Sequence, residues 1–532
     1  MEVRTRYLFI ILAVGTLLFL FNLGGRDLWE PDETRYAVVA REMVQSGNWI
    51  LPHLNRDIYA EKPPLFFWLV NLSTFLGGAN SELANRLPSA LAGLITLFVT
   101  FLLGERLFHP RVGFLSAMVL ATSILFLQIS RWMMLDSLFT LLFLFTIFYF
   151  FQGFENEARR RRYYLFAGLF MGLGVLTKGP VAYLPVPIFI IFGLSQRKVK
   201  AFWNTHLLWG ILLSLLVVFL WLVPACWVGG EEYTKRILFG QTVGRLMGSE
   251  KYFHREPIFF YLIRFPLDFF PWIVLLPSAL ILGFRNKENV RKEFLFLVIW
   301  FLVIFFFFTL SKGKKDNYLL PLHPATAMLI GILWDSEIRS SKRSWGPTTG
   351  LVVLTFLFLS GFLLFVTGIP EKLYPHLRAY QSVDFWTLFY LPLGSLFSVL
   401  LFLKRKKRAS FMTLVVAFGL FYLHLSLILP KFNSERSMKV FSERILARIG
   451  PEDELKMAFS EFNGLLYYSQ KPYIEEIKST DRFSQVLHSP QGVRVVIPLK
   501  YFEVIKRKLN LEQVSVEQVR AGPYDLVLFS NK

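Results

Sequence analysis

Long runs of apolar residues, separated by short polar loops, recur along most of this 532-residue chain. About thirteen of these runs approach the ~20 residues that an α-helix needs to cross a bilayer. The expected spans cover residues 7–23, 86–107, 111–129, 133–151, 163–177, 180–194, 206–224, 257–283, 294–310, 319–334, 348–368, 385–403 and 410–429. The pattern therefore predicts a mainly α-helical, polytopic membrane protein.

Two regions depart from this pattern. Residues 65–77 are a shorter apolar stretch after Pro63-Pro64, where we expect a helix lying at the membrane interface. Beyond Lys431 the hydrophobicity falls, and short apolar runs alternate with helical-looking stretches, which is typical of a small α/β domain. We expect a transmembrane domain over residues 1–430, with juxtamembrane helices in the loop 24–85. A soluble, external α/β domain should follow over residues 431–532.

The net charge of +20 does not indicate a nucleic-acid partner, because the basic residues gather in alternate loops between the apolar runs. Short basic loops of a membrane protein face the cytoplasm. One set of loops is basic, around Arg106, Arg159–Arg162, Arg197–Lys200, Arg285–Lys292, Arg339–Arg343 and Lys404–Arg408. With an odd number of spans, the loop 24–85 and the C-terminal region then lie on the external side.

That external loop carries ionisable side chains beside the bilayer, where charge is costly and usually functional. Asp32 and Glu33 open a stretch whose helical spacing predicts a short amphipathic helix to Gln45, ended by Ser46-Gly47. Adjacent helical residues point about 100° apart. We therefore expect Asp32 to act on an acceptor while Glu33 holds the loop. The alternatives are an N-cap role for Asp32 and an interfacial salt-bridge cluster, in which Arg35 and Arg41 pair with these carboxylates.

Glu61-Lys62-Pro63-Pro64 places a cation just before a helix started by proline. The helix N-terminus and the Lys62 ammonium together favour a phosphate. A carboxylate pair followed by a lysine suits the reaction of a hydroxyl or similar group with a phosphate-bearing substrate.

Three further polar groups lie at external helix ends. Asp136 begins a span, where it lines the same cavity or caps the helix. His254 precedes another span and, with Glu61, is a candidate metal pair, although no spacing motif supports it. The basic turn from Ser311 to Tyr318 suggests phosphate contact by a lysine and by Tyr318, or simple turn chemistry.

An ordered set of motifs resembles the aminoarabinose transferase (ArnT)-like branch of the polyprenyl-phosphate-sugar glycosyltransferases, which is distantly similar to the protein O-mannosyltransferases. The motifs are Leu28-Trp29-Glu30-Pro31-Asp32-Glu33-Thr34-Arg35-Tyr36-Ala37, Ala40-Arg41-Glu42-Met43, Glu61-Lys62-Pro63-Pro64-Leu65, Asn85-Arg86-Leu87-Pro88-Ser89-Ala90, Leu176-Thr177-Lys178-Gly179-Pro180 and Ser311-Lys312-Gly313-Lys314. The turn Lys315-Asp316-Asn317 departs from the family, because it is more polar than the Leu-Pro type of this branch.

The resemblance implies a GT-C architecture and transfer of a sugar from a polyprenyl phosphate carrier on the external face. By motif, Asp32 matches the important acidic residue and Asp136 a second cavity carboxylate, while Lys62 and Tyr318 match carrier-phosphate contacts. Glu61 and His254 match a pair that can hold zinc, although catalysis need not require a metal.

The resulting hypothesis is an inverting glycosyltransferase of the bacterial inner membrane, acting on its periplasmic face. The candidate catalytic residues are Asp32, Asp136 and Glu33, and the candidate substrate-binding residues are Lys62, Tyr318, Arg35, Tyr36, Arg255 and Lys314. The expected partners are the lipid-linked donor, a lipid or protein acceptor and bilayer lipids. In one form of this hypothesis, the transferred sugar is 4-amino-4-deoxy-L-arabinose and the acceptor is lipid A. Protein O-glycosylation and lipid-linked-sugar transport are the alternatives.

Overall fold

The computed structural model describes residues 2–78, 80–238, 256–285, 291–340, 344–367, 385–450, 453–509 and 515–531. Within this part of the chain the contacts divide into two compact units. Unit 1 contains residues 1–23, 60–69 and 86–427, and unit 2 contains residues 24–59, 70–85 and 428–532. Each unit is described by itself.

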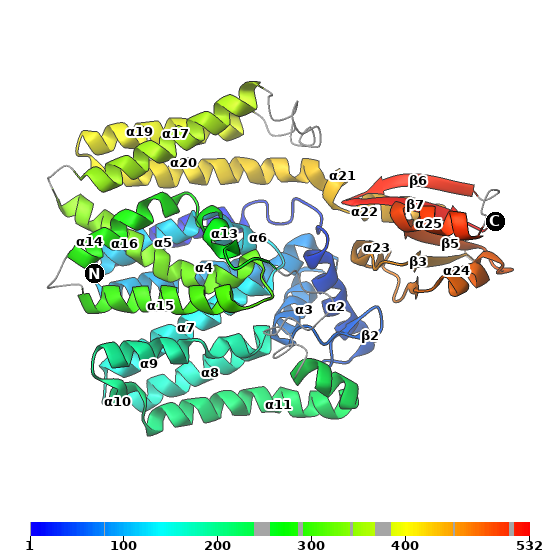
Figure 1. Cartoon of the computed structure of the whole chain (residues 1–532), viewed down its shortest axis with the longest axis horizontal. Helices are drawn as coiled ribbons and strands as arrows, with labels where there is room; N and C mark the ends of the chain where they lie inside the picture. Colours follow the sequence, from blue (N-terminus) through cyan, green and yellow to red (C-terminus); the bar gives the residue numbers. More distant parts are fainter. Residues whose placement is uncertain are drawn as a thin grey trace. The chain divides into compact units, whose positions relative to one another are not determined.

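Unit 1 is helical, and its long helices run side by side (Figure 1). Eight helices of the described residues are long and apolar enough to cross a membrane. They are α1 (Glu2–Leu20), α4 (Glu82–Leu107), α7 (Leu135–Glu155), α11 (Thr205–Lys235), α15 (Arg291–Leu310), α17 (Trp345–Thr367), α19 (Phe385–Leu403) and α20 (Lys407–Ile428). The polytopic membrane architecture expected from the apolar pattern is confirmed.

Two bent pairs raise the number of spans to ten. The first pair joins α5 (Pro110–Ala121) to α6 (Ile124–Arg131) at 68°, and the second joins α13 (Phe260–Asp268) to residues 272–285, which end in α14 (Leu276–Arg285), at 105°. The remaining three expected stretches are also helical but shorter or more polar. They are α8 (Arg160–Lys178), α9 (Pro185–Ser195) and α16 (His323–Arg339), and the short helix α10 (Val199–Phe202) follows α9.

Close approach between α8 and α11 depends on glycine. A Cβ atom on Gly168 would lie 2.0 Å from the backbone oxygen of Gly210, so the two helices pack backbone against backbone. Small residues allow this contact in membrane proteins, where helix association relies on packing.

Polar contacts in unit 1 join helix ends that the charge pattern assigns to the same side. On the side with basic loops, Arg4 pairs with Glu105 at 3.0 Å and Lys292 with Glu155 at 2.6 Å. On the opposite side, Arg131 donates to the carbonyl oxygen of Phe21 at 2.8 Å. These contacts agree with the predicted alternation of the loops between the two sides of the membrane. If a span had been missed, helix ends assigned to opposite sides would be in contact.

Unit 2 combines part of the loop 24–85 with the C-terminal segment. The loop supplies α2 (Asp32–Ser46), a hairpin of β1 (His53–Leu54) and β2 (Asp57–Ile58), and the second half of α3 (Leu65–Gly77). Helix α2 ends at Gly47, whose φ of 68° is the left-handed conformation that glycine adopts at a helix C-terminus. The helix expected over Asp32–Gln45 is thus confirmed.

The C-terminal segment forms a five-stranded sheet in the order β4-β3-β5-β7-β6. Strand β3 is parallel to β4 and β5, whereas β7 is antiparallel to β5 and β6. The strands are β3 (Glu454–Ala458), β4 (Glu475–Ile477), β5 (Val493–Pro498), β6 (Ser515–Ala521) and β7 (Tyr524–Ser530), and the helices are α21 (Asn433–Arg436), α22 (Lys439–Leu446), α23 (Asn463–Tyr468), α24 (Thr480–Leu487) and α25 (Leu499–Leu509). The expected α/β character is confirmed.

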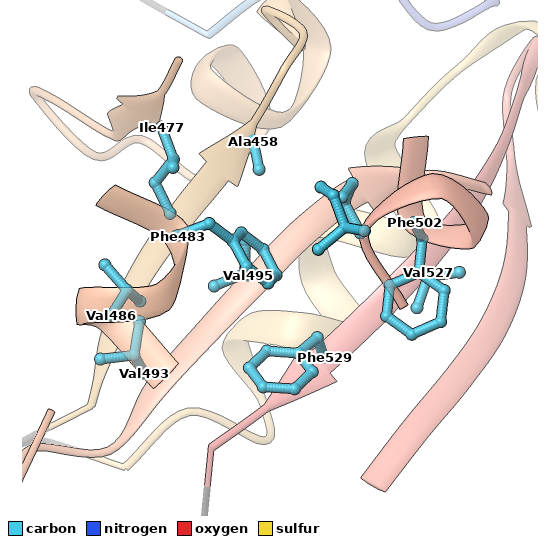
Figure 2. Close-up of a cluster of buried hydrophobic side chains, with 11 residues drawn as sticks. Ala458, Ile477, Phe483, Val486, Val493, Val495, Phe502, Val527 and Phe529 are labelled. Atoms are coloured by element: carbon cyan, nitrogen blue, oxygen red, sulfur yellow. The ribbon is translucent and has the colours of Figure 1, made fainter. Parts of the chain in front are cut away.

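The core of this domain is formed by the apolar faces of its strands, where side chains alternate, and of its helices, where they recur every three to four residues. Val493, Val495 and Ile497 alternate along β5 and face one side of the sheet, where Phe483 of α24 and Phe502 of α25 cover them (Figure 2). The intervening Val496 is also fully buried, so both faces of the strand are covered.

We expect Phe529→Ala to destabilise the C-terminal domain by about 3–5 kcal/mol, because the Phe529 side chain is fully buried in this core and its removal leaves a cavity. Hydrogen exchange of β5 and β7 in the intact protein measures the effect. Val504→Ala, at a side chain that is 52% exposed, is the control. Equal protection in the two variants would contradict the assignment of this core.

Candidate functional site

Asp136 forms the centre of a buried polar group in unit 1. It is the second residue of α7 and is 2% exposed. Its Oδ1 atom forms an ion pair with Lys178, the last residue of α8, and its Oδ2 atom accepts a hydrogen bond of 2.8 Å from the amide of Asn317. Both carboxylate oxygens are therefore satisfied by side chains from other elements.

Aromatic rings enclose the cation of this group. The Lys178 ammonium lies 4.8 Å from the ring centroid of Tyr318 and 5.3 Å from that of Phe139. These distances allow a cation–π interaction in addition to the ion pair. We call Asp136, Lys178, Asn317 and Tyr318 the Asp136 cluster. It brings together two expected site residues, Asp136 and Tyr318.

Lys314 lies close to this cluster in sequence but has a different environment. Its ammonium is buried and donates to the carbonyl oxygens of Ser311 at 2.7 Å and Glu256 at 3.2 Å. Burial lowers the pKa of Lys314. These contacts favour a role in shaping the turn over the expected contact with substrate.

Lys62 and Glu61 precede the first turn of α3 and belong to unit 1. Lys62 is half-buried and Glu61 is exposed, while Pro63 and Pro64 are buried. The amide of Trp68 donates to the carbonyl oxygen of Pro64 at 3.0 Å, so the helix begins directly after the two prolines. Lys62 therefore stands at a helix N-terminus, a setting that favours an anion.

Asp32 belongs to unit 2, at the start of α2. It forms an ion pair with Arg35 one turn along the helix, and the Arg35 guanidinium lies 5.4 Å from the ring centroid of Tyr36. The side chain of Asp32 is 25% exposed, in contrast to its neighbour Glu33 at 1%. The residue before α2, Pro31, contributes no side-chain cap, and Asp32 is a first-turn residue rather than the N-cap.

The negative charge of Glu33 is compensated within the loop. Both of its oxygens bind Arg26, at 2.6 and 3.2 Å, and one also accepts the backbone N–H of Trp29 at 3.0 Å. The Arg26 guanidinium covers the Trp29 ring at 4.4 Å. This geometry favours loop-holding, the role considered for Glu33 from the sequence, over direct catalysis.

Glu30 is a buried carboxyl group that the sequence reasoning did not single out. Its Oε1 atom accepts the backbone N–H of Gly464 from α23, and its Oε2 atom has no hydrogen-bond partner among the described residues. Burial raises the pKa of Glu30 to about 7, although the Gly464 amide and the nearby Thr34 and Arg35 oppose the shift. A protonated Glu30 fits this environment, since burial penalises the charged form.

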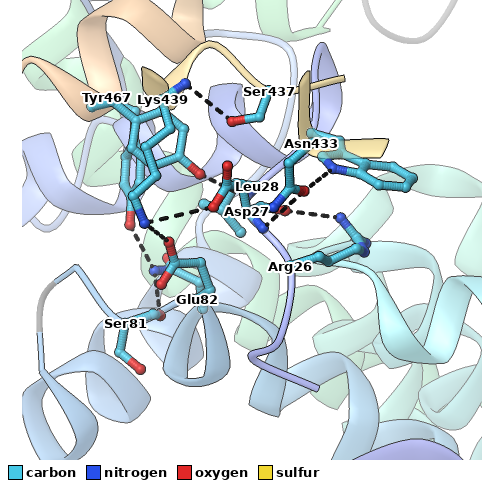
Figure 3. Close-up of polar contacts among 12 residues, drawn as sticks. Arg26, Asp27, Leu28, Ser81, Glu82, Asn433, Ser437, Lys439 and Tyr467 are labelled. Atoms are coloured by element: carbon cyan, nitrogen blue, oxygen red, sulfur yellow. Dashed lines mark hydrogen bonds and ion pairs between the residues drawn. The ribbon is translucent and has the colours of Figure 1, made fainter. Parts of the chain in front are cut away.

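The rest of the loop docks on the C-terminal segment through polar contacts (Figure 3). The amide of Leu28 donates to the Tyr468 hydroxyl at 2.7 Å, and Lys439 pairs with Glu82 at 3.1 Å. Pairing of Arg41 with the acidic residues was one alternative from the sequence, but Arg41 donates to backbone carbonyl oxygens of α23, including that of Tyr467 at 2.8 Å. These contacts make loop and domain one unit.

His254 and Arg255 lie outside the described residues, so the expected metal pair and the expected third phosphate contact stay predictions. Among the residues that are described, no group of three or more His, Cys, Asp or Glu side chains could hold a metal ion. Sequence reasoning flagged Lys178 through its motif. It missed the partnership of Asn317 with Asp136, because nothing in the spacing of residues 136 and 317 indicates contact.

The described residues form a polytopic, mainly helical membrane fold with a small α/β domain. ArnT from Cupriavidus metallidurans bound to undecaprenyl phosphate has the same fold, with a TM-score of 0.82 and 22% sequence identity, covering 99% of this chain and 98% of the other.

The chain is similar to aminoarabinose transferases, which confirms the resemblance drawn from its motifs. It is 29% identical to the undecaprenyl phosphate-alpha-4-amino-4-deoxy-L-arabinose arabinosyl transferase of Photorhabdus laumondii over 372 residues, which are 68% of this chain and 66% of that protein. It is 32% identical to the second such enzyme of Proteus mirabilis over 328 residues, 60% of this chain and 58% of the other. The matched part thus spans less than two thirds of either relative. A family model described as dolichyl-phosphate-mannose-protein mannosyltransferase matches residues 61–223.

The pKa of Glu30 leads to a pH-dependent prediction. Its folded pKa of about 7 exceeds the ordinary value of 4.5, so the folded protein holds a proton that the unfolded chain releases between these pH values. Stability should therefore fall by roughly 2–3 kcal/mol as the pH rises from about 4.5 to 7. Glu30→Gln should remove this loss and raise the melting temperature at pH 8.

Thermal unfolding in detergent at pH 5 and pH 8 measures this effect. Glu503→Gln, at an exposed carboxylate of the same unit, is the control and should leave the pH dependence of wild type intact. A Glu30→Gln variant that melts like wild type at both pH values would refute the assigned protonation.

Proposed function

We propose that the protein is an integral-membrane glycosyltransferase that moves a sugar from a polyprenyl phosphate carrier to an acceptor of the cell envelope. The observation that carries this proposal is the similarity to undecaprenyl phosphate-aminoarabinose transferases, at 29% identity over 372 residues and 32% over 328 residues. The clustered charges at helix ends in unit 1 support it, since a structural scaffold does not require them.

The reaction is a displacement at the anomeric carbon of the sugar. The acceptor oxygen forms a bond to that carbon while the bond to the carrier phosphate breaks, and the electron pair leaves with the polyprenyl phosphate. Inversion of configuration follows from a single displacement. The negative charge on the leaving phosphate grows, so cations and hydroxyl donors near it stabilise the transition state. Lys62, Tyr318 and Arg255 are the proposed donors.

Asp32 is the proposed acceptor-side catalytic residue. Its partly exposed carboxylate can orient a hydroxyl and take its proton as the new bond forms. An acceptor that is already an anionic phosphate requires only orientation. Arg35 forms an ion pair with Asp32 and lies over the Tyr36 ring, and both residues are the proposed contacts of the acceptor or sugar. In the Asp136 cluster, Asp136 keeps the ammonium of Lys178 beside Tyr318.

The proposed sugar comes from the names of the relatives. Those names give aminoarabinose, so we propose 4-amino-4-deoxy-L-arabinose as the donor sugar. Lipid A is the proposed acceptor, as the resemblance of the sequence motifs implies. The match of residues 61–223 to the mannosyltransferase model favours a protein acceptor as the second candidate. Comparing the masses of envelope glycolipids and glycoproteins from a deletion strain and its parent distinguishes the two.

We place the protein in the bacterial inner membrane with its active site on the periplasmic face, because the basic loops should face the cytoplasm. Lysine and tyrosine donors suffice for the leaving phosphate, so the mechanism includes no metal ion. Glu61 and His254 would hold a zinc ion if one binds.

A lipid-linked-sugar transporter is the rival function. Transporters carry polar or broken helices through the membrane midplane. In the described part of the chain, Asp136 and Lys178 instead lie at helix ends. The test supplies a radiolabelled polyprenyl-phosphate sugar in vesicles with the purified protein. Label that moves to acceptor molecules supports the transferase, and label that moves only between leaflets refutes it.

We expect Asp32→Asn to reduce turnover by about 10²- to 10⁴-fold, because the amide cannot accept the proton of the acceptor. Binding of undecaprenyl phosphate should stay within about twofold of wild type, because the proposed contacts of the carrier phosphate are Lys62, Tyr318 and Arg255, not Asp32. Transfer of radiolabelled sugar under single-turnover conditions measures the effect.

Asp57→Asn is the matched control, because Asp57 lies in the same loop with a side chain that is 84% exposed. Near-normal transfer by Asp32→Asn would remove Asp32 from the mechanism. An equal loss in both variants would indicate a general effect of charge in the loop.

A further inference from the structure

The turn that carries Tyr318 is tied to α13 through the backbone of Lys315. The hydroxyl of Tyr261 donates to the Lys315 carbonyl oxygen at 3.0 Å, and the Lys315 amide lies 3.3 Å from the same hydroxyl. The turn from Ser311 to Tyr318 contains no proline to fix its backbone. Its conformation therefore depends on contacts with neighbouring elements.

Arg264 forms an ion pair with this turn. Its Nη2 atom lies 2.5 Å from Asp316, at the start of the short 3₁₀ helix Asp316–Leu322, and its Nε atom lies 3.3 Å from Asp268. Asp268 is buried and lies on α13, and the other edge of the guanidinium reaches the turn. The guanidinium thus has a carboxylate on each side, although its Nε atom makes no hydrogen bond among the described residues.

Tyr318 follows Asp316 by two residues, and its amide donates to the Lys315 carbonyl oxygen at 3.1 Å. Asn317, between them, binds Asp136. The 3₁₀ helix is consequently held from two sides, by α13 through Asp316 and by α7 through Asn317. A shift of Asp316 would move the Tyr318 ring away from Lys178.

We propose that Arg264 is a positioning residue that sets Tyr318 for its contact with the carrier phosphate, an inference that rests on the proposed function. A half-exposed ion pair contributes little to stability. The same pair can have a large effect on a reaction, because small displacements of a positioned group are costly. Asp268 orients Arg264, Arg264 holds Asp316, and Asp316 fixes the start of the helix that carries Tyr318.

The test is a double-mutant cycle on the full-length protein, with binding of undecaprenyl phosphate as the measurement. Tyr318→Phe should weaken binding roughly tenfold. Arg264→Gln and Asp316→Asn should each weaken it about three- to tenfold. In the Tyr318→Phe background, both substitutions should cost less than about twofold, because their effect passes through the Tyr318 hydroxyl.

Asp316→Asn is the variant on which the test relies, since Arg264→Gln leaves the buried Asp268 without its cation and can impair folding. Lys315→Gln is the control, because this exposed lysine contacts Tyr261 only through its backbone. It should bind the carrier like wild type.

The outcomes separate this inference from the proposed function. Binding losses that add up in the double variants would overturn the positioning role of Arg264 and leave the carrier contact of Tyr318 intact. A Tyr318→Phe variant that binds like wild type would overturn both. Non-additive losses with an unchanged melting temperature for Asp316→Asn support the inference.

Discussion

The candidate site of unit 1 depends on the interactions that the buried carboxylate of Asp136 makes with its neighbours. It is buried, and it is shared by Lys178 and Asn317, which come from two other parts of the chain. A buried ion pair adds little net stability, but loss of one partner leaves a charge without compensation. The arrangement therefore specifies where α7, α8 and the 3₁₀ helix of Tyr318 must lie. The ammonium beside the Tyr318 ring is a consequence of this arrangement.

The acidic loop distributes its charges differently. Glu33 is neutralised by Arg26, and Glu42 accepts the backbone amides of Asn55 and Arg56, at 2.7 and 3.1 Å. Asp32 alone among these three carboxylates keeps a quarter of its side chain exposed. The neighbours thus supply the framework and leave Asp32 accessible. This division leaves the Asp32 carboxylate available for the proposed reaction, while its acidic neighbours hold the loop.

The apolar spacing was sufficient to predict the helices, because length and composition decide whether a segment can span a bilayer. It also predicted α2 with its end at Gly47 and the apolar strands of the C-terminal sheet. The contacts of the site could not be predicted in the same way. The sequence offered a carboxylate as one possible partner of Arg41, yet Arg41 binds carbonyl oxygens more than 400 residues away in sequence. Glu30 and Asn317 were missed because their partners, Gly464 and Asp136, are distant along the chain and share no spacing pattern with them.

The division of unit 2 into separate segments has a consequence for biosynthesis. The acidic loop leaves the ribosome early, whereas Gly464 and Tyr468, which bind Glu30 and Leu28, belong to about the last eighth of the chain. At about 5–20 residues per second, translation from Glu30 to Gly464 takes on the order of 20–90 seconds. During this interval Glu30 and Arg41 have no native partners from α23 and must remain hydrated. The contacts of Glu30 and Arg41 with α23 can therefore form only late in synthesis, so the segment around the start of α2 is completed by residues that are translated long after it.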